Sequence, residues 1–410
     1  MPKSHSEPSS LAPETSTSGE HGSGSSVSPI IDFHTHVYPP LLTNAINTIA
    51  AQAKSRLAQG LSIANVPEAF REKVELAATT IASKIGTGWA GAREVLKEAF
   101  MPLARRSHEM QTQARTFPPI IRDLLDELGA VSIFPHLILE SSAADQLHAM
   151  DELAIDAALT VAFPPLISSD FILELAAQDS RRIPVVAFDK KQSLEDVDRL
   201  FERYHSAGVR ILKIYPLYDG LDADSAFYQH QLQLAEKNKW LVILHTGALH
   251  VKLFMPRTEL GDVTRFESWF TTFPQLNFVL AHMGLHASRP VIDLAKKHLN
   301  TWLTTSWQPA DVIAQAVHAI GANRILYSSD WPLLGENMRV GIGRIRELED
   351  NSMITPPEAQ LVLGGNAQKL LETVKIQVRS YLVLKRNSSL GRLLSTDSTQ
   401  AISEQLVSNF

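Results

Sequence analysis

Eight short runs rich in Val, Ile and Leu recur from Pro29 onward, and each is followed by a stretch with helical character. Runs that are apolar on both faces are typical of parallel strands covered by helices. Eight strand–helix units between residues 29 and 375 predict an α/β fold, a closed (β/α)8 barrel of the TIM type. A doubly wound open sheet is the competing architecture. The runs are residues 30–36, 159–165, 183–189, 210–216, 241–247, 277–284, 301–307 and 324–332.

The connection after the first strand is abnormally long for a barrel. Residues 41–129 are predicted to form a helical insertion, whereas a strand–helix connection normally has only a few residues. Because the insertion leaves the carboxyl end of a strand, it is expected either to cap the active-site face or to pack against the side of the barrel. Residues 1–28 are predicted to be a disordered polar tail, and residues 376–410 a polar, partly helical one.

Composition limits the kind of chemistry and partner. The chain contains no cysteine, so any metal must be held by His, Asp, Glu or a modified Lys. The net charge of −6 says little about partners, but the lack of a basic stripe argues against nucleic acid. The first 28 residues lack the apolar centre of a signal peptide, and no apolar run is long enough to span a bilayer. We therefore expect a cytoplasmic protein that acts on a small-molecule substrate without a membrane partner, and the formation of a homo-oligomer is left open.

His34 and His36 lie two residues apart in the first predicted strand, so their side chains point to the same face. Two imidazoles buried side by side in an apolar strand are costly unless they have partners. A shared metal ion removes that cost, because neutral imidazole nitrogen is a good ligand for Zn²⁺. The alternative is a chance pair at a strand end that forms hydrogen bonds with loops.

Further polar residues lie late in four other predicted strands. Lys213 is in the fourth strand, His245 in the fifth, His282 in the sixth and Asp330 in the eighth. In a barrel the carboxyl ends of the strands meet at one rim, where such enzymes place their catalytic groups. The positions therefore predict a metal site at that rim.

The ordered set DFHTH, KIYP, HTG, AHMG, SSDWP and LVLGGNAQKLL resembles the amidohydrolase superfamily, and more closely its amidohydrolase-related branch with the aminocarboxymuconate-semialdehyde decarboxylase-like enzymes. The resemblance covers about residues 29–371. It implies that His34, His36, His245 and Asp330 bind a divalent metal. His282 would bind a second ion or polarise the substrate.

The resemblance leaves the number of metal ions open. In binuclear relatives a carbamate formed on a lysine of the fourth strand bridges two ions, and Lys213 is on the matching strand. An unmodified Lys213 could instead pair with a substrate carboxylate or with Asp330. One ion is the preferred expectation, with Zn²⁺ as the first choice and Mn²⁺ suited to the same ligands.

Metal-activated water makes hydrolysis the expected reaction. A bound ion lowers the pKa of water towards about 7, Asp330 can accept its proton, and the metal or protonated His282 can polarise the substrate carbonyl. The predicted substrate is an amide, lactone or ester. The first alternative is a lyase, a non-oxidative decarboxylase of an unsaturated or aromatic carboxylic acid. The second is an inert barrel that serves as a binding protein.

Four residues near the predicted rim are candidates for contact with the substrate. Arg289 could receive an anionic group, and His286 follows the sixth strand. Trp307 and Trp331 follow the seventh and eighth strands, where indole rings could wall a pocket. For each of these residues a purely structural role is the alternative.

Overall fold

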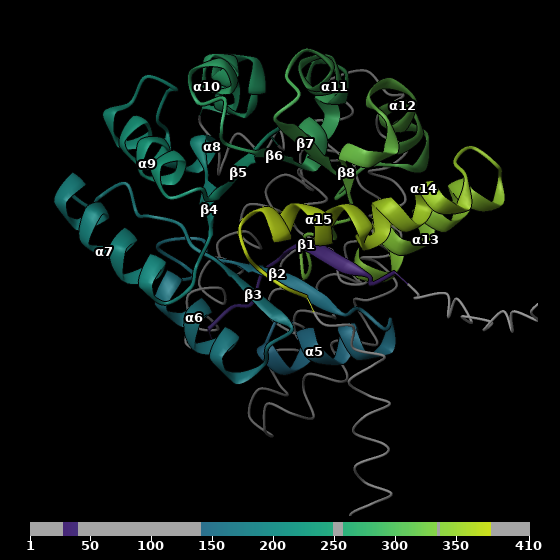
Figure 1. The fold of residues 1–410 in the computed structure, drawn as a ribbon, viewed down its shortest axis with the longest axis horizontal. Helices are drawn as coiled ribbons and strands as arrows, with labels where there is room; N and C mark the ends of the chain where they lie inside the picture. Colours follow the sequence, from purple (N-terminus) through teal and green to yellow (C-terminus); the bar gives the residue numbers. More distant parts are fainter. Residues whose placement is uncertain (1–27, 40–140, 249–256, 334–336, 379–410) are drawn as a thin grey trace, which may run out of the picture.

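The computed structural model describes residues 28–39, 141–248, 257–333 and 337–378 (Figure 1). Within these ranges all eight predicted strands are present and parallel to their neighbours. The strands are β1 (Ile31–Thr35), β2 (Ala157–Val161), β3 (Arg182–Val185), β4 (Ile211–Ile214), β5 (Leu241–His245), β6 (Phe278–Ala281), β7 (Thr301–Thr304) and β8 (Ile325–Leu326).

The strands follow one another in sequence order around a closed ring. β1 to β3 form one hydrogen-bonded sheet and β4 to β8 form another. The two sheets are joined through a bridge between Val186 and Leu212, where the amide of Val186 donates to the carbonyl of Ile211 at 3.1 Å. At the opposite seam the amide of Phe33 donates to the carbonyl of Tyr327 at 3.0 Å. The predicted (β/α)8 barrel is confirmed.

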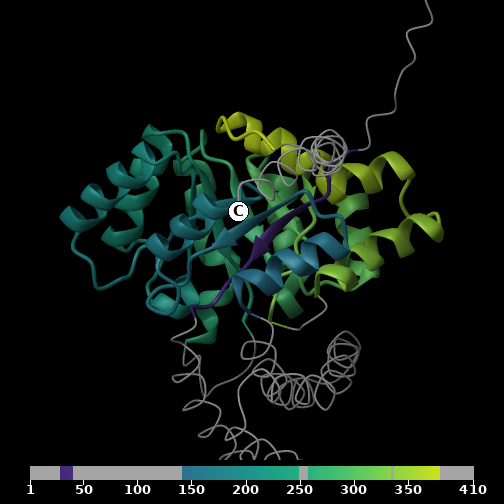
Figure 2. The same cartoon turned by 90° about the horizontal axis from the view of Figure 1, so that it is seen from below.

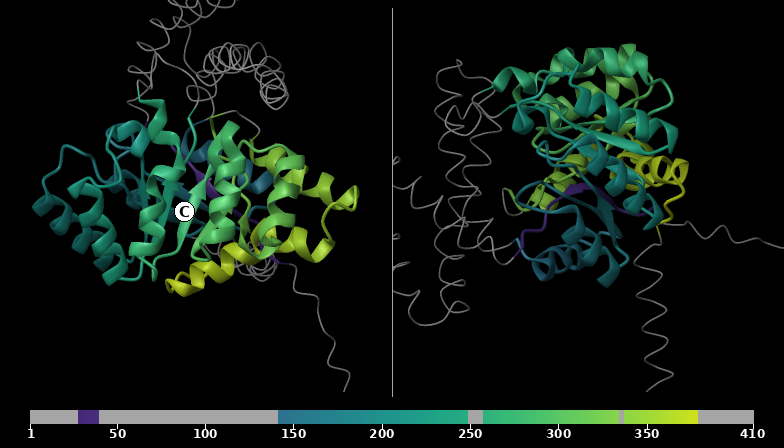
Figure 3. Two further views of the ribbon diagram at one scale, coloured as in Figure 1. Left: turned by 90° about the horizontal axis from the view of Figure 1, so that it is seen from above. Right: turned by 90° about the vertical axis from the view of Figure 1, so that its left-hand side faces the viewer.

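Helices surround the ring and cover the outer face of the strands (Figures 1 and 3). In Figure 2 the purple β1 runs beside β2, and in Figure 3 the green helices α11 and α12 lie next to each other on the outside. Every residue of β1, β2 and β5 is buried, as expected for strands between a filled interior and a layer of helices.

The helices are α5 (Ala143–Glu152), α6 (Ser169–Gln178), α7 (Leu194–Ser206), α8 (Pro216–Asp219), α9 (Ala226–Lys237), α10 (Glu267–Thr272), α11 (Ser288–Lys297), α12 (Ala310–Ile320), α13 (Asn337–Asp350), α14 (Pro356–Gln360) and α15 (Asn366–Thr373). Short 3-10 segments are η3 (Thr258–Gly261), η4 (Val263–Phe266), η5 (His282–Ala287) and η6 (Ala322–Arg324), and a π-helical turn is η7 (Leu361–Gly365).

Helix α7 shows how local sequence sets these elements. Ser193 precedes the helix, and its hydroxyl accepts a hydrogen bond from the amide of Asp196 at 3.1 Å, while the Asp196 carboxylate accepts from the amide of Ser193. This reciprocal pairing satisfies amide groups that the first helical turn leaves free. After the helix, Gly208 adopts a φ of +92°, which suits glycine and turns the chain towards β4.

The predicted insertion at 41–129 lies outside the described residues, as does the predicted tail 1–28 apart from Ser28. Of the predicted tail 376–410, the structure describes only residues 376–378, which are irregular. Over the ranges that the structure describes, no helix is both long and apolar enough to cross a membrane.

The π-helical turn η7 packs against the start of β1. A Cβ atom on Gly364 would lie 1.8 Å from the carbonyl oxygen of Pro29, so this approach requires glycine. Two residues later, the side-chain amide of Asn366 donates to the carbonyl of Ile325 in β8 at 2.8 Å. The segment LVLGGNAQKLL therefore packs against the start of β1 and is hydrogen-bonded to the start of β8.

This packing predicts a large effect of one methyl group. Gly364→Ala should lower the free energy of unfolding by about 3 kcal/mol, because the backbone must move to admit the Cβ atom. Gly343→Ala is the matched control, since Gly343 is exposed on α13 with no atom within 4 Å of the added carbon. Urea unfolding followed by circular dichroism measures both. Equal stability of the two variants would show that the close approach does not constrain the fold.

Candidate functional site

Asp32 and His34 of β1 alternate with the apolar Ile31 and Phe33 and share one face. The carboxylate of Asp32 accepts hydrogen bonds from the amides of His34 at 3.1 Å and Ser329 at 2.9 Å. Burial raises the pKa of Asp32 to about 7, against the opposing effect of these hydrogen bonds. Asp32 thus joins β1 to the segment that follows β8.

The same junction brings Asp330 to the histidines of β1. The amide of Asp330 donates to the carbonyl of His34 at 2.9 Å. Its Oδ1 then lies 3.6 Å from Nε2 of His34 and 3.5 Å from Nε2 of His36. Nδ1 of His36 is 3.0 Å from the carbonyl oxygen of Val161. Because a carbonyl can only accept, Nδ1 carries the proton, and the lone pair of Nε2 is on the side of Asp330.

His245 and His282 complete the ring of imidazoles. The ring centroids of His34 and His282 are 5.0 Å apart, and those of His245 and His282 are 4.9 Å apart. One potential ligand atom each from His34, His282 and Asp330 lies within 4.8 Å of the others. His36 adjoins this group through Asp330, and His245 adjoins it through His282.

Three of the buried imidazoles, those of His34, His245 and His282, have pKa values below the ordinary value of histidine. Burial lowers the pKa of His34 and His245 well below the ordinary value, with a further contribution from the Lys213 charge. Burial also lowers the pKa of His282 to about 4. The expectation that protonated His282 polarises a substrate is therefore not favoured, and the neutral form is the one that binds metals.

Several buried polar atoms face one another without partners. Both ring nitrogens of His34, Nε2 of His245 and Nζ of Lys213 lack a hydrogen-bond partner among the described residues. Burial by itself raises the pKa of Asp330, yet the neighbouring His282 and His34 hold it well below its ordinary range. A divalent cation fits both the orphaned nitrogens and the carboxylate, because it takes lone pairs from neutral imidazoles and supplies positive charge beside Asp330.

Aromatic rings line another side of this cluster. The ring of Tyr218 lies 5.2 Å from that of His245 and 4.9 Å from that of Phe163. Tyr215 lies 4.9 Å from Phe163, and Nζ of Lys213 is 5.0 Å from the centre of the Tyr215 ring. Burial lowers the pKa of Lys213 to about 7, although the charge of Asp330 opposes this.

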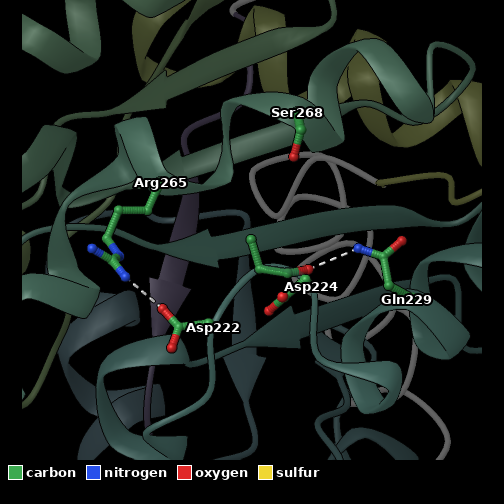
Figure 4. A pocket seen from close by; sticks show the side chains of 6 residues that line it. Asp222, Asp224, Gln229, Arg265 and Ser268 are labelled. Carbon is green, nitrogen blue, oxygen red and sulfur yellow. Dashed lines mark hydrogen bonds and ion pairs between the residues drawn. The ribbon is translucent and has the colours of Figure 1, made fainter.

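A second hollow, about 610 Å³ in volume, is lined by residues that follow β4 and β5 (Figure 4). Its carboxylate Asp222 is paired with Arg265 at 2.6 Å and with Arg257 at 3.1 Å. These ion pairs neutralise the acid, so the histidine cluster in the barrel remains the candidate site.

The sequence matches the family model described as "Amidohydrolase" over residues 31–373. The chain belongs to the amidohydrolase family. The resemblance predicted from the six motifs is thus confirmed. A comparison with curated proteins gave no match.

Several solved structures are similar to this chain. An uncharacterised TIM-barrel protein from Bordetella bronchiseptica has a TM-score of 0.50 and 18% identity, over 63% of this chain and 92% of that chain. A 2,6-dihydroxybenzoate decarboxylase from Rhizobium has a TM-score of 0.45 and 20% identity, over 55% and 87%. A putative 2-pyrone-4,6-dicarboxylic acid hydrolase from Pseudomonas putida has a TM-score of 0.42 and 16% identity, over 58% and 89%.

The barrel brings together the residues predicted for metal binding and for catalysis. His34, His36, His245, His282 and Asp330 form one buried cluster, as the distances above show. Lys213 is 1% exposed and lowers the pKa of His34, so its amine shares this interior. The three residues whose potential ligand atoms lie within 4.8 Å of one another are His34, His282 and Asp330, so this group includes His282 but neither His36 nor His245. Which residues bind the metal therefore stays a prediction.

The four residues predicted to contact substrate lie in different settings. Trp307 is half-buried, and its indole N–H donates to Oδ2 of Asp330 at 2.6 Å. Trp331 is buried, and its backbone amide donates to Ser329. His286 is half-buried and Arg289 is exposed on α11. Their contact with a substrate stays a prediction.

The sequence interpretation missed Gln308, which supports the turn after β6. In this turn His282, Met283 and Leu285 all have positive φ angles, of +63°, +48° and +51°, which side chains other than glycine rarely adopt. The buried amide of Gln308 donates to the carbonyls of His282, at 2.5 Å, and Leu285, at 3.2 Å. No periodicity marks Gln308, because its role depends on a turn whose shape the sequence does not reveal.

The sequence interpretation also missed the aromatic side of the site. Phe163 and Tyr215 lie late in the second and fourth predicted runs, at the same rim as the histidines. Their position after parallel strands was an available signal. Tyr218 lies in α8, outside any run, and only the fold brings it to His245.

The orphaned amine of Lys213 predicts an unusual stability effect. Lys213→Met should raise the free energy of unfolding by about 1–3 kcal/mol, because it removes a buried polar group that has no hydrogen-bond partner. Lys191→Met, at an exposed position, is the control and should change stability by less than about 0.5 kcal/mol. Chemical denaturation of chelator-treated protein measures both. Destabilisation by Lys213→Met would mean that the amine has a structural partner.

Proposed function

We propose that this protein is a metal-dependent hydrolase that uses water to cleave an amide, lactone or ester bond of a small molecule. The observation that carries the proposal is the set of unpaired imidazole nitrogens around the buried carboxylate of Asp330. Nitrogen and carboxylate donors suit Zn²⁺, the first choice, and also Mn²⁺. When bound, such an ion lowers the pKa of water and polarises a carbonyl group.

The residues of the chain have distinct proposed roles. His34, His36, His245 and Asp330 are the proposed ligands of a single ion. Asp330, held as a carboxylate, accepts a proton from the attacking water and passes it to the leaving group. The neutral imidazole of His282 lies beside the ligands, with Nδ1 hydrogen-bonded to the Ser306 hydroxyl at 2.8 Å, which fixes the orientation of the ring towards the substrate.

Decarboxylation of an unsaturated or aromatic carboxylic acid is the second candidate. The supporting observation is the buried, unpaired amine of Lys213 near the rings of Phe163, Tyr215 and Tyr218. A planar substrate could pack against these rings while its carboxylate pairs with the ammonium form of Lys213. The same cluster of histidines serves either reaction.

Metal analysis tests the site directly. Purified protein should contain close to one divalent ion per chain, and Asp330→Asn should lower both the metal content and turnover, the latter by at least about 100-fold. Asp224→Asn, at the exposed pocket of Figure 4, is the matched control and should behave like the native protein. Full metal content and activity in Asp330→Asn would refute the assignment.

The reaction type is tested by a substrate screen in isotopically labelled water. Lactones, amides, esters and unsaturated or aromatic carboxylic acids are supplied to the metal-loaded protein, and products are read by mass spectrometry. Hydrolysis predicts that labelled oxygen enters a product carboxyl group. Release of carbon dioxide with no label in the organic product would replace the hydrolase proposal by the decarboxylase.

A further inference from the structure

We propose that Trp307 is a positioning residue whose indole N–H sets the orientation of the Asp330 carboxylate for metal binding. The inference rests on the proposed function, since it assumes that Asp330 holds the ion. It departs from the expectation that the Trp307 ring walls a substrate pocket.

The two oxygens of Asp330 lie in different surroundings. Oδ1 faces Nε2 of His34 and Nε2 of His36, at 3.6 and 3.5 Å. Oδ2 accepts the indole N–H of Trp307 at 2.6 Å and lies 3.7 Å from Nδ1 of His282. The hydrogen bond therefore presents Oδ1 to the β1 histidines and keeps Oδ2 turned away from them.

An indole is well suited to this task. Its nitrogen only donates and does not ionise, so the bond to Oδ2 neither competes as a metal ligand nor depends on the protonation of the donor. A hydrogen bond to a charged group is also stronger than one between neutral groups. Loss of a hydrogen-bonded partner of a ligating side chain typically weakens metal binding by about 10- to 100-fold.

The backbone of Trp307 has an unfavourable conformation that its surroundings enforce. Its φ is +65°, a conformation that a bulky residue rarely adopts, and Asp330 opposite has a φ of +60°. The preceding residues are anchored to β8, since the amide of Thr305 donates to the carbonyl of Leu326 and that of Ser306 donates to the Ser328 hydroxyl. Such conformations persist when the surrounding structure enforces them, and they cluster at functional sites.

The test removes the N–H group and keeps the ring. Trp307 is replaced in the full chain by 3-benzothienylalanine, in which sulfur takes the place of the indole nitrogen, and in parallel by Trp307→Phe. The control makes the same two changes at Trp302 in β7, the strand that precedes Trp307; the Trp302 indole donates to Oδ1 of Asn277 at 3.1 Å. The readouts are the dissociation constant of Zn²⁺ from chelator-treated protein, measured against a chromophoric chelator, and kcat and KM on a substrate found in the screen.

Loss of the Trp307 N–H should weaken Zn²⁺ binding by about 10- to 100-fold and lower kcat, with KM little changed. The same changes at Trp302 should leave both values as in the native protein. Native Zn²⁺ affinity and kcat in the benzothienylalanine protein would overturn the inference. An increase in KM alone, largest for Trp307→Phe, would also overturn it. That result would support the alternative role of Trp307, in which its ring lines the substrate pocket.

Failure of the underlying function has a separate signature. If native protein and Asp330→Asn bind Zn²⁺ equally, the metal site at Asp330 is wrong, and the inference about Trp307 is wrong with it. If Asp330→Asn alone loses affinity and the Trp307 variants do not, the proposed function stands and only the positioning role fails.

Discussion

The hydrogen bonds between β1 and the segment after β8 are the constraint on which the rest of this structure depends. The amide of Asp330 donates to the carbonyl of His34, and the side chains of the same two residues approach to 3.6 Å. Closing the barrel and assembling the site are therefore one event. Asp32 strengthens the same junction through the amides of His34 and Ser329. A strand register shifted by one residue would turn both histidines out of the interior.

Several features of the site destabilise the fold, and the packing of the rest of the barrel must offset them. Unpaired nitrogens of His34 and His245 and the amine of Lys213 are buried without hydrogen bonds among the described residues. His282, Trp307 and Asp330 have left-handed backbone conformations, each of which costs about 1–3 kcal/mol. These features lie at the end of β5, after β6, β7 and β8, or on the inner face of β1 and β4. A fold selected for stability alone would avoid them, whereas a site that binds a cation needs them.

The opposite end of the barrel shows the contrasting pattern. There Gly364 allows a close backbone approach to Pro29, and Asn366 satisfies the carbonyl of Ile325. The side-chain amide of Asn366 also donates to the carbonyl of Ala322, and the packing at Gly364 leaves no room for a methyl group. The division between a well-packed base and a strained rim is typical of enzymes built on this barrel.

The sequence by itself determined the eight strands, their parallel arrangement and the face on which His34, His36, His245, His282, Lys213 and Asp330 would meet. Periodicity and strand-end position contain that information, because the period of a strand fixes the direction of each side chain. Only the tertiary structure decided which oxygen of Asp330 faces the histidines, that Trp307 binds the other, and that Gln308 and Tyr218 belong to the site. Those contacts join residues from separate loops through turns with left-handed backbone angles, and no local pattern in the sequence encodes where such turns point.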